Sequence, residues 1–181
     1  MDDGLDVVPA AVMAGIWRGP AIGGLALLLC AALACSAPPL ANTRDSAETL
    51  GREVLAAFES RDDARLRALA LSEEEFRRHV WPSLPAARPE RNLPLSYVWG
   101  DLQQKSDNRL RVNLGVHGGR EYQLQRITFS GGIAGYSGFR VHRDALLTIR
   151  DSAGAEDQIR LFGSAIEMDG AWKVFSFNAD D

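Results

Sequence analysis

Cysteine is scarce in this chain. There are two cysteines, Cys30 and Cys35, and both lie near the N-terminus. The residues that follow Cys35 have no pair of thiols to form a disulfide, so the fold must be stabilised by its hydrophobic core alone.

Histidine and clustered positive charge are scarce as well. The three histidines, His79, His117 and His142, are scattered and show none of the short spacings typical of a metal site. The formal net charge is -4, and arginines are interleaved with acidic residues, so there is no basic stripe. A chain of this composition is not expected to bind nucleic acid. We also expect no metal ion and no other cofactor.

A hydrophobic run long enough to cross a membrane is lacking too. The uncharged stretch from Ala21 to Ala37 is shorter than the ~20 apolar residues that a membrane-spanning helix needs. It follows Arg18 and contains the small residues Ala32 and Ala34, a pattern typical of a secretory signal peptide. Residues 1–34 are therefore predicted to be a signal peptide.

The beginning of the chain does not fit that pattern, because aspartates precede Met13. Translation from Met13 would remove these acids and leave the basic Arg18 close to the start, as signal peptides require. Met13 is therefore predicted to be the true start.

Cys35 directly follows the predicted cleavage site. Residues 32–35, Ala-Leu-Ala-Cys, resemble the bacterial lipobox, in which the cysteine is acylated and becomes the new N-terminus. We expect Cys35 to be lipidated, because a free thiol in an oxidising compartment would have no partner, and residues 35–44 to form a tether. The chain is then an exported, membrane-anchored lipoprotein of the cell envelope. The alternative is simple secretion as a soluble periplasmic or extracellular protein.

Residues 45–181 are then expected to form a single domain, whose first half contains four helices. Their predicted starts are a capping box at Asp45 and Glu48, an N-cap at Asp62 or Asp63, a capping box at Ser72 and Glu75, and Pro94. The third helix is expected to end near Trp81, because Pro82 disfavours helical backbone at the residue before it. The proline-rich residues 82–94 are expected to be an irregular connection.

Beyond the fourth helix the apolar pattern alternates, as in a β-strand. The alternation predicts one strand over 110–116 and a second over 122–129, whose change of phase predicts a β-bulge near Gln125. The glycine-rich residues 130–138 are expected to be a hairpin loop, and the strands that follow are joined by a tight turn at 169–170. This order predicts an α+β fold, with N-terminal helices packed on one face of a curved antiparallel sheet.

The closing sequence "DGAWKVFSF", Asp169 to Phe177, resembles a known family. Helices followed by long hairpin strands and a Gly-x-Trp-Lys-Val hairpin are similar to the nuclear-transport-factor-2-like, cystatin-like α+β superfamily. The resemblance implies a cone-shaped space between helices and sheet. Its members include enzymes, ligand-binding proteins and dimerisation modules, so it does not imply one function.

Five residues are candidates for binding a ligand. Trp81, Tyr97 and Trp99 flank the proline-rich connection, near the expected open end of the cone, and they either line an apolar pocket or belong to the core. Arg140 and His142 alternate with apolar residues, so they share one strand face. That face either binds an anionic ligand or forms ion pairs with a neighbouring strand.

Enzymes of this superfamily place carboxylates with a tyrosine or histidine in the cone. The chain offers for such a role Asp101, Asp144, Glu167, Tyr97, Tyr122, His117 and His142. None stands at a spacing that matches a family motif, so we assign no catalytic residue.

The sequence thus favours a non-catalytic envelope lipoprotein that binds a small apolar or anionic ligand, or another envelope protein. A small cavity enzyme, isomerase-like or cyclase-like, is the second hypothesis. A homodimerisation module that uses the open sheet face is the third.

Overall fold

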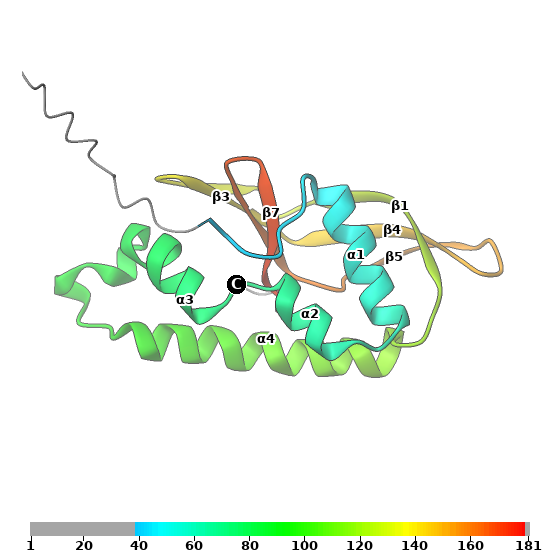
Figure 1. Ribbon diagram of the computed structural model, residues 1–181, viewed down its shortest axis with the longest axis horizontal. Coiled ribbons are helices and arrows are strands. Elements are labelled where there is room, and N and C mark those ends of the chain that lie inside the picture. The colour runs from blue at the N-terminus through cyan, green and yellow to red at the C-terminus, as the bar shows by residue number, and fades with distance from the viewer. Residues whose placement is uncertain (1–38, 180–181) are drawn as a thin grey trace, which may run out of the picture. The chain divides into compact units, whose positions relative to one another are not determined.

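The computed structural model of the protein describes residues 39–179 and has the predicted α+β order, helices first and strands after (Figure 1). The predicted signal peptide, Met13 and Cys35 lie outside the described residues. No helix within residues 39–179 has both the length and the hydropathy needed to cross a membrane.

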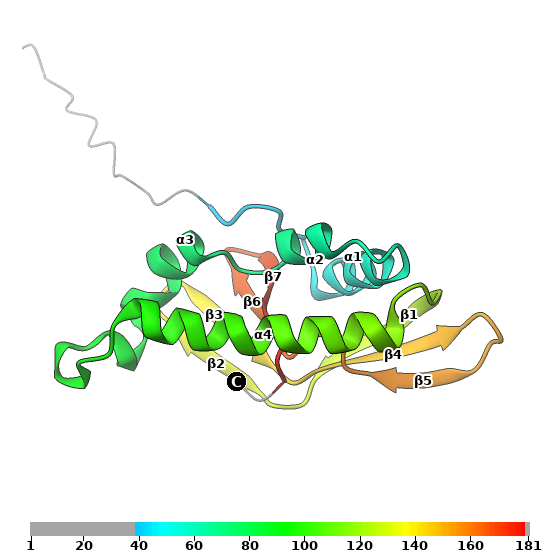
Figure 2. The ribbon, with the colours of Figure 1, turned by 90° about the horizontal axis from the view of Figure 1, so that it is seen from below.

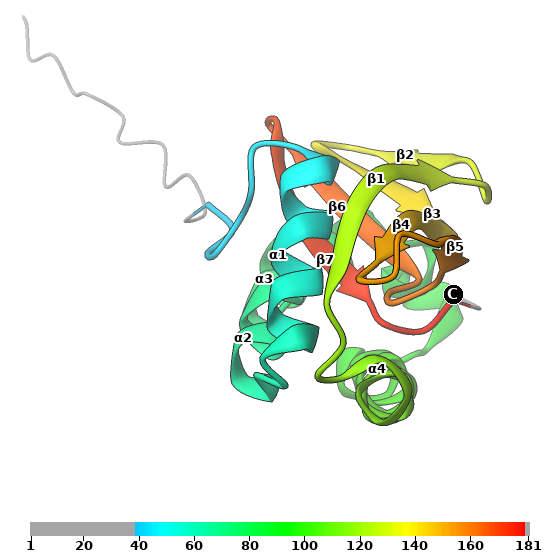
Figure 3. The same ribbon diagram turned by 90° about the vertical axis from the view of Figure 1, so that its right-hand side faces the viewer.

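Within residues 39–179, four α-helices precede seven β-strands. The helices are α1 (Ala47–Glu59), α2 (Asp63–Leu69), α3 (Glu73–Glu75) and α4 (Leu95–His117). The strands are β1 (Tyr122–Phe129), β2 (Ile133–Tyr136), β3 (Phe139–Arg143), β4 (Ala145–Asp151), β5 (Glu156–Ile159), β6 (Ser164–Met168) and β7 (Ala171–Ser176). Seen from its end, the domain has α1 and α2 on the left, α4 at the bottom and β4 and β5 on the right (Figure 3).

The first two helices begin at side-chain caps. Ser46 caps α1 by accepting a hydrogen bond from the Thr49 N–H at 3.1 Å, so the cap lies one residue after the predicted Asp45. Asp62 caps α2, as predicted, by accepting from the Arg65 N–H at 2.9 Å. Both caps satisfy backbone donors that the first helical turn leaves unpaired.

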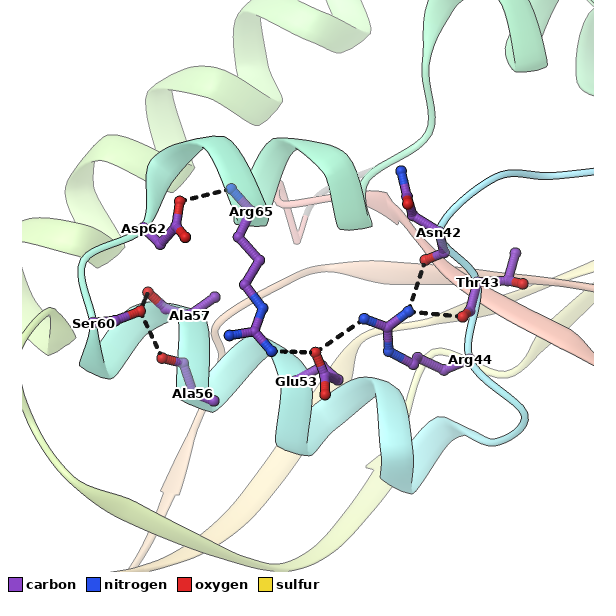
Figure 4. A network of polar contacts seen from close by, with 9 residues as sticks. All are labelled: Asn42, Thr43, Arg44, Glu53, Ala56, Ala57, Ser60, Asp62 and Arg65. Atoms are coloured by element: carbon purple, nitrogen blue, oxygen red, sulfur yellow. Dashed lines mark hydrogen bonds and ion pairs between the residues drawn. The ribbon is translucent and has the colours of Figure 1, made fainter.

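Glu53 of α1 joins three segments (Figure 4). Its Oε2 accepts from Arg44, which precedes α1, at 2.9 Å and from Arg65 of α2 at 2.6 Å. These two guanidinium groups hold the pKa of Glu53 below its usual value. All three side chains are partly exposed, so the network orients the segments more than it stabilises them.

The third helix has the predicted capping box. The Glu75 N–H donates to Ser72 Oγ, and Glu75 Oε2 accepts from the Ser72 N–H at 2.8 Å. The helix continues as a wider π-helical turn over Phe76–Val80, which sequence patterns did not indicate. Residues 81–91 then form three short 3₁₀ turns, each with proline in its first turn, where an irregular connection was expected.

Helix α4 contradicts one prediction. It runs for 23 residues, past both strand ladders (Figure 2), so residues 110–116 are helical and the predicted strand is wrong. Ser106, Leu110 and Asn113 are buried at helical spacing, whereas Val112 and Val116 are 55% and 50% exposed. The alternation of valine and leucine is therefore accidental, because half of it faces solvent.

Polar residues on the buried stripe of α4 conceal its helical period. Asn113 donates through Nδ2 to the Leu161 carbonyl at 2.9 Å, and Ser106 Oγ accepts from the Phe177 N–H at 3.0 Å. Both side chains satisfy backbone groups of the strand region that would otherwise be buried without partners. A pattern that scores only apolar residues misses such contacts.

The strands form two antiparallel ladders, β1-β4-β5 and β2-β3-β6-β7. The predicted bulge is confirmed, because the register of β1 shifts between Leu124 and Arg126. The glycine-rich residues 130–138 are not simply a loop, because they contain β2, which pairs with β3 through backbone bonds that need no particular side chain. The predicted tight turn is also confirmed, since Asp169 and Gly170 both have positive φ, 51° and 79°.

Strands β6 and β7 are covered on both faces. Ala165 and Val174 belong to a core shared with α1, α2, α4 and β4. Ile166 belongs to a second core, which also contains Leu40 from the segment expected as a tether and Phe76 after α3. The edge of β7 that does not pair with β6 is covered too, because the backbone N–H groups of Arg44 and Leu71 donate hydrogen bonds to carbonyls of β7.

A buried ion pair fixes α3 on the sheet. Lys173 of β7, 2% exposed, donates from Nζ to both carboxylate oxygens of Glu75, at 2.9 and 2.8 Å. The same carboxylate accepts from the Ala41 N–H and from Ser72. Burial alone would raise the pKa of Glu75, but the ammonium and these donors hold it below its usual value.

Candidate functional site

An apolar pocket lies between the β2-β3-β6-β7 ladder and the chain that follows α3. Its volume is about 150 Å³. Its lining residues come from the segment after α3 and from β2, β3, β6 and β7, and they are Val80, Leu84, Ala134, Tyr136, Phe139, Val141, Arg143, Ser164 and Phe175. Residues far apart in the sequence therefore form one pocket.

Ser164 is the unusual residue of this pocket. It is 3% exposed, and its Oγ is the one buried side-chain nitrogen or oxygen atom within residues 39–179 that has no hydrogen-bond partner. Leaving a buried polar group unpaired costs about 1–3 kcal/mol. A hydroxyl that has no partner within the protein, in the wall of a cavity, can bind an ordered water molecule or a polar atom of a ligand.

Arg143 lines the same pocket. It lies opposite Ser164 in the antiparallel pairing of β3 with β6, so the two side chains stand next to each other on one sheet face. Its guanidinium forms no ion pair with any residue of the described range 39–179. The pocket thus combines mostly apolar walls with two hydroxyl-bearing side chains, Ser164 and Tyr136, and one cation, Arg143.

The three aromatic residues proposed from the sequence lie outside this pocket. Trp81 and Trp99 are partly buried and pack around Phe76, with ring centroids 6.3 and 5.2 Å from it. Tyr97 is 66% exposed. Both tryptophans thus pack against the second core, Trp99 also lines a separate pocket of about 30 Å³, and Tyr97 lies on the surface.

Arg140 and His142 meet the same carboxylate, that of Glu167 on the neighbouring strand. Arg140 donates to Oε1 at 2.5 Å and His142 Nε2 to Oε2 at 2.8 Å. Burial raises the pKa of Glu167, but the bonds from His142 and Arg140 outweigh it and lower the pKa below its usual value. Both carboxylate oxygens are used within the cluster, which favours the cross-strand ion pair over an anion-binding face.

The imidazole of this cluster is also packed between aromatic rings. His142 lies 4.5 Å from the ring of Trp172 and 5.2 Å from that of Phe129, measured between centroids. Its side chain is 9% exposed. Such packing fixes the orientation of the ring and leaves little room for a substrate beside it.

The other acids considered for catalysis are not brought together. Asp101 pairs with Lys105 on the exposed side of α4, at 2.7 Å, and Asp144 lies 3.9 Å from Arg160. None of them lines the pocket that contains Ser164. Within residues 39–179 there is also no group of three histidine, cysteine or acidic side chains that could hold a metal ion.

One histidine and one tyrosine from the sequence analysis do meet. His117 Nδ1 and the Tyr122 hydroxyl are 3.3 Å apart, at the junction of α4 and β1. Burial, followed by the nearby charge of Arg120, lowers the pKa of His117. The pair lies away from the Ser164 pocket and holds the end of a helix against the first strand.

Sequence reasoning missed Ser164 and Arg143. A signal for Arg143 was present, because it continues the alternation of Phe139 and Val141 and so belongs to the face that was expected to point inward. Ser164 gives no such signal. Its importance depends on the lack of a hydrogen-bond partner, which only the three-dimensional contacts reveal.

Comparisons with known proteins assign no family. No protein-family model matches the chain, and neither a curated protein nor a solved structure matches it.

Proposed function

We propose that this protein is an exported envelope lipoprotein whose α+β domain binds a small, mostly apolar ligand in the Ser164 pocket without transforming it. The carrying observation is the pocket itself, with apolar walls and a buried hydroxyl that has no partner. Small-molecule sites typically combine an apolar lining with few polar groups that fix the orientation of the ligand.

The size of the pocket limits the ligand. A volume of about 150 Å³ equals that of an engineered apolar cavity known to bind benzene. The bound part of the ligand is therefore expected to hold about six to eight carbon atoms.

The anchor is proposed from the sequence alone. A lipid on Cys35 would be joined to Leu40, which is buried in the second core. The five residue-to-residue steps from Cys35 to Leu40 span at most about 18 Å when extended. The pocket would then stay close to the bilayer, where apolar molecules concentrate.

The two other hypotheses have less support. A cavity enzyme would need an acid or base beside the ligand, and the pocket lining contains no carboxylate and no histidine. For a dimer formed through 157–167 and 171–177, exposed apolar side chains are expected there. The large apolar side chains most exposed within residues 39–179 are elsewhere: Leu93, Tyr97, Val112, Val116 and Ile133. Membership of the nuclear-transport-factor-2-like superfamily remains part of this proposal.

Native mass spectrometry of the protein purified from membranes of its own host tests the ligand. Wild-type protein should retain an added mass, and Ala134→Trp, which fills the pocket, should lose it. The matched control is Ile133→Trp on the same strand, where the side chain is exposed. A wild-type protein that carries no added mass and binds no apolar probe would contradict the proposal.

Fractionation tests the anchor. Cys35→Ser should move the protein from the membrane to the soluble fraction and remove the acyl mass, whereas Cys30→Ser should change neither. If the protein with Cys35→Ser still sediments with membranes, the lipid anchor is wrong.

A further inference from the structure

We infer that the ligand of the Ser164 pocket is a small monocarboxylate, whose carboxylate is bound by Arg143 and Ser164 while its apolar part fills the rest. This inference deepens the proposed function and depends on it. It concerns the chemical class of the ligand and the residues that select it.

The positions of the two residues are the first argument. Arg143 and Ser164 are direct neighbours across β3 and β6, on the face that lines the pocket. The backbone of Arg143 is held on both sides of the turn, because its N–H donates to the Gly132 carbonyl and its carbonyl accepts from the Gly131 N–H. The two side chains thus start from neighbouring positions on paired strands, Arg143 at the exposed rim and Ser164 in the buried wall, and the remaining lining is apolar except for the phenol of Tyr136.

The charges around the pocket are the second argument. Three cations on β3, on β7 and after β5 have acidic partners: Arg140 with Glu167, Lys173 with Glu75, and Arg160 with Asp144. Arg143 has no such partner within the described residues, and no acid lines the pocket. One positive charge beside an apolar cavity favours an anionic ligand over a neutral or cationic one.

The number of donors decides between anions. Two guanidinium N–H groups and the Ser164 hydroxyl match the two oxygens of a carboxylate, and the Tyr136 hydroxyl is a further donor of the lining. A phosphate brings more oxygens and more charge than this set can pair. The volume of about 150 Å³ leaves room for a short alkyl chain or one ring, so hexanoate is a suitable probe.

The test measures calorimetric affinities of the full-length protein in lipid nanodiscs, with protein-free discs as blank, for hexanoate, 1-hexanol and hexylamine. Hexanoate should bind about tenfold more tightly than 1-hexanol, as expected for one charge-assisted hydrogen-bond pair that is partly exposed. Hexylamine should bind most weakly, because its ammonium would lie beside Arg143.

Single substitutions test which residues cause the preference for hexanoate over 1-hexanol. Arg143→Gln should abolish the advantage of hexanoate over 1-hexanol and leave 1-hexanol unchanged, and Arg143→Lys should keep part of it. Arg140→Gln, on the opposite face of the same strand, is the matched control and should leave the preference within twofold. Ser164→Ala should lower the affinity for both hexanoate and 1-hexanol. It should also raise the thermal midpoint of the ligand-free protein, because it removes a buried hydroxyl that has no partner within the protein.

Two outcomes separate the inference from the proposed function. If 1-hexanol binds as tightly as hexanoate, or if Arg143→Gln keeps the preference, the monocarboxylate inference is wrong and the pocket still binds apolar ligands. If none of the three probes binds the wild-type protein, the proposed function itself fails.

Discussion

Replacing Lys173 by methionine should destabilise the protein more than any change of Glu73 or Glu74, the exposed acids of α3. Methionine preserves most of the length and apolar character of the lysine stem and removes the ammonium. The Glu75 carboxylate, which is 9% exposed, would then be buried without its cation. Removing one partner of a buried ion pair costs about 3–5 kcal/mol.

The contacts of Glu75 place the expected loss at the lower end of that range. Three donors remain after the substitution: the Ala41 N–H at 2.8 Å and the backbone and hydroxyl of Ser72, each at 2.8 Å. They partly solvate the charge, so we expect the free energy of unfolding to fall by about 3 kcal/mol at pH 7.

The loss should depend on pH. In the wild-type protein the pKa of Glu75 is lowered on folding, so its stabilising contribution is complete above the usual pKa of 4.5 and is lost as the pH falls below it. Without the ammonium of Lys173, burial raises the pKa of Glu75, and the folded variant takes up a proton more easily. The difference between wild type and variant should therefore shrink from pH 7 towards pH 4.

Urea denaturation followed by tryptophan fluorescence at several pH values measures both effects. Lys105→Met is the matched control, because Lys105 is the other lysine of the chain and its side chain is 54% exposed; it should cost less than about 1 kcal/mol. A loss below 1 kcal/mol for Lys173→Met, or a loss that does not change with pH, would refute the reasoning. Acetylation of the native protein should also modify Lys105 and spare Lys173.

Two further predictions concern the fold. Leu110→Ala should lower the free energy of unfolding by about 2–5 kcal/mol, because Leu110 is fully buried. Val112→Ala, on the exposed side of α4, should lower it by less than about 1 kcal/mol. Equal losses for the two variants in thermal or urea denaturation would contradict the helical register. Gly163→Ala should severely reduce the yield of folded protein measured by circular dichroism, because its Cβ would lie 1.6 Å from the carbonyl oxygen of Asn178. Gly135→Ala, with no atom within 4 Å, should fold normally, and equal behaviour of the two variants would show that the crowding is relieved by a small shift.

Local chemistry explains which parts of the fold could be predicted. The capping box of Ser72 and Glu75, the bulge near Gln125 and the turn at 169–170 each depend on residues close in the sequence, and all three are confirmed. Helix α4 beyond residue 105 could not be recognised, because its buried stripe contains polar side chains whose partners lie in distant strands.

The candidate site was harder to predict for the same reason. The sequence drew attention to tryptophans and to the conspicuous Arg140 and His142, whose partners turned out to be Phe76 and Glu167. A residue that is well paired in the fold has little left to offer a ligand. The residues of interest are those that remain unpaired, and a list of residue types does not reveal them.

The way in which the first described residues join the domain also determines how mechanical force would enter it. Leu40 is buried, the Ala41 N–H is bound to Glu75, and Arg44 exchanges two backbone hydrogen bonds with Trp172. A pull transmitted from a lipid on Cys35 would reach β7 and α3 before it reached α1. If Cys35 carries the proposed lipid, drag on the protein would be borne first by the strand pairing and the ion pair, and then by the Arg44–Glu53 pair where the chain enters α1.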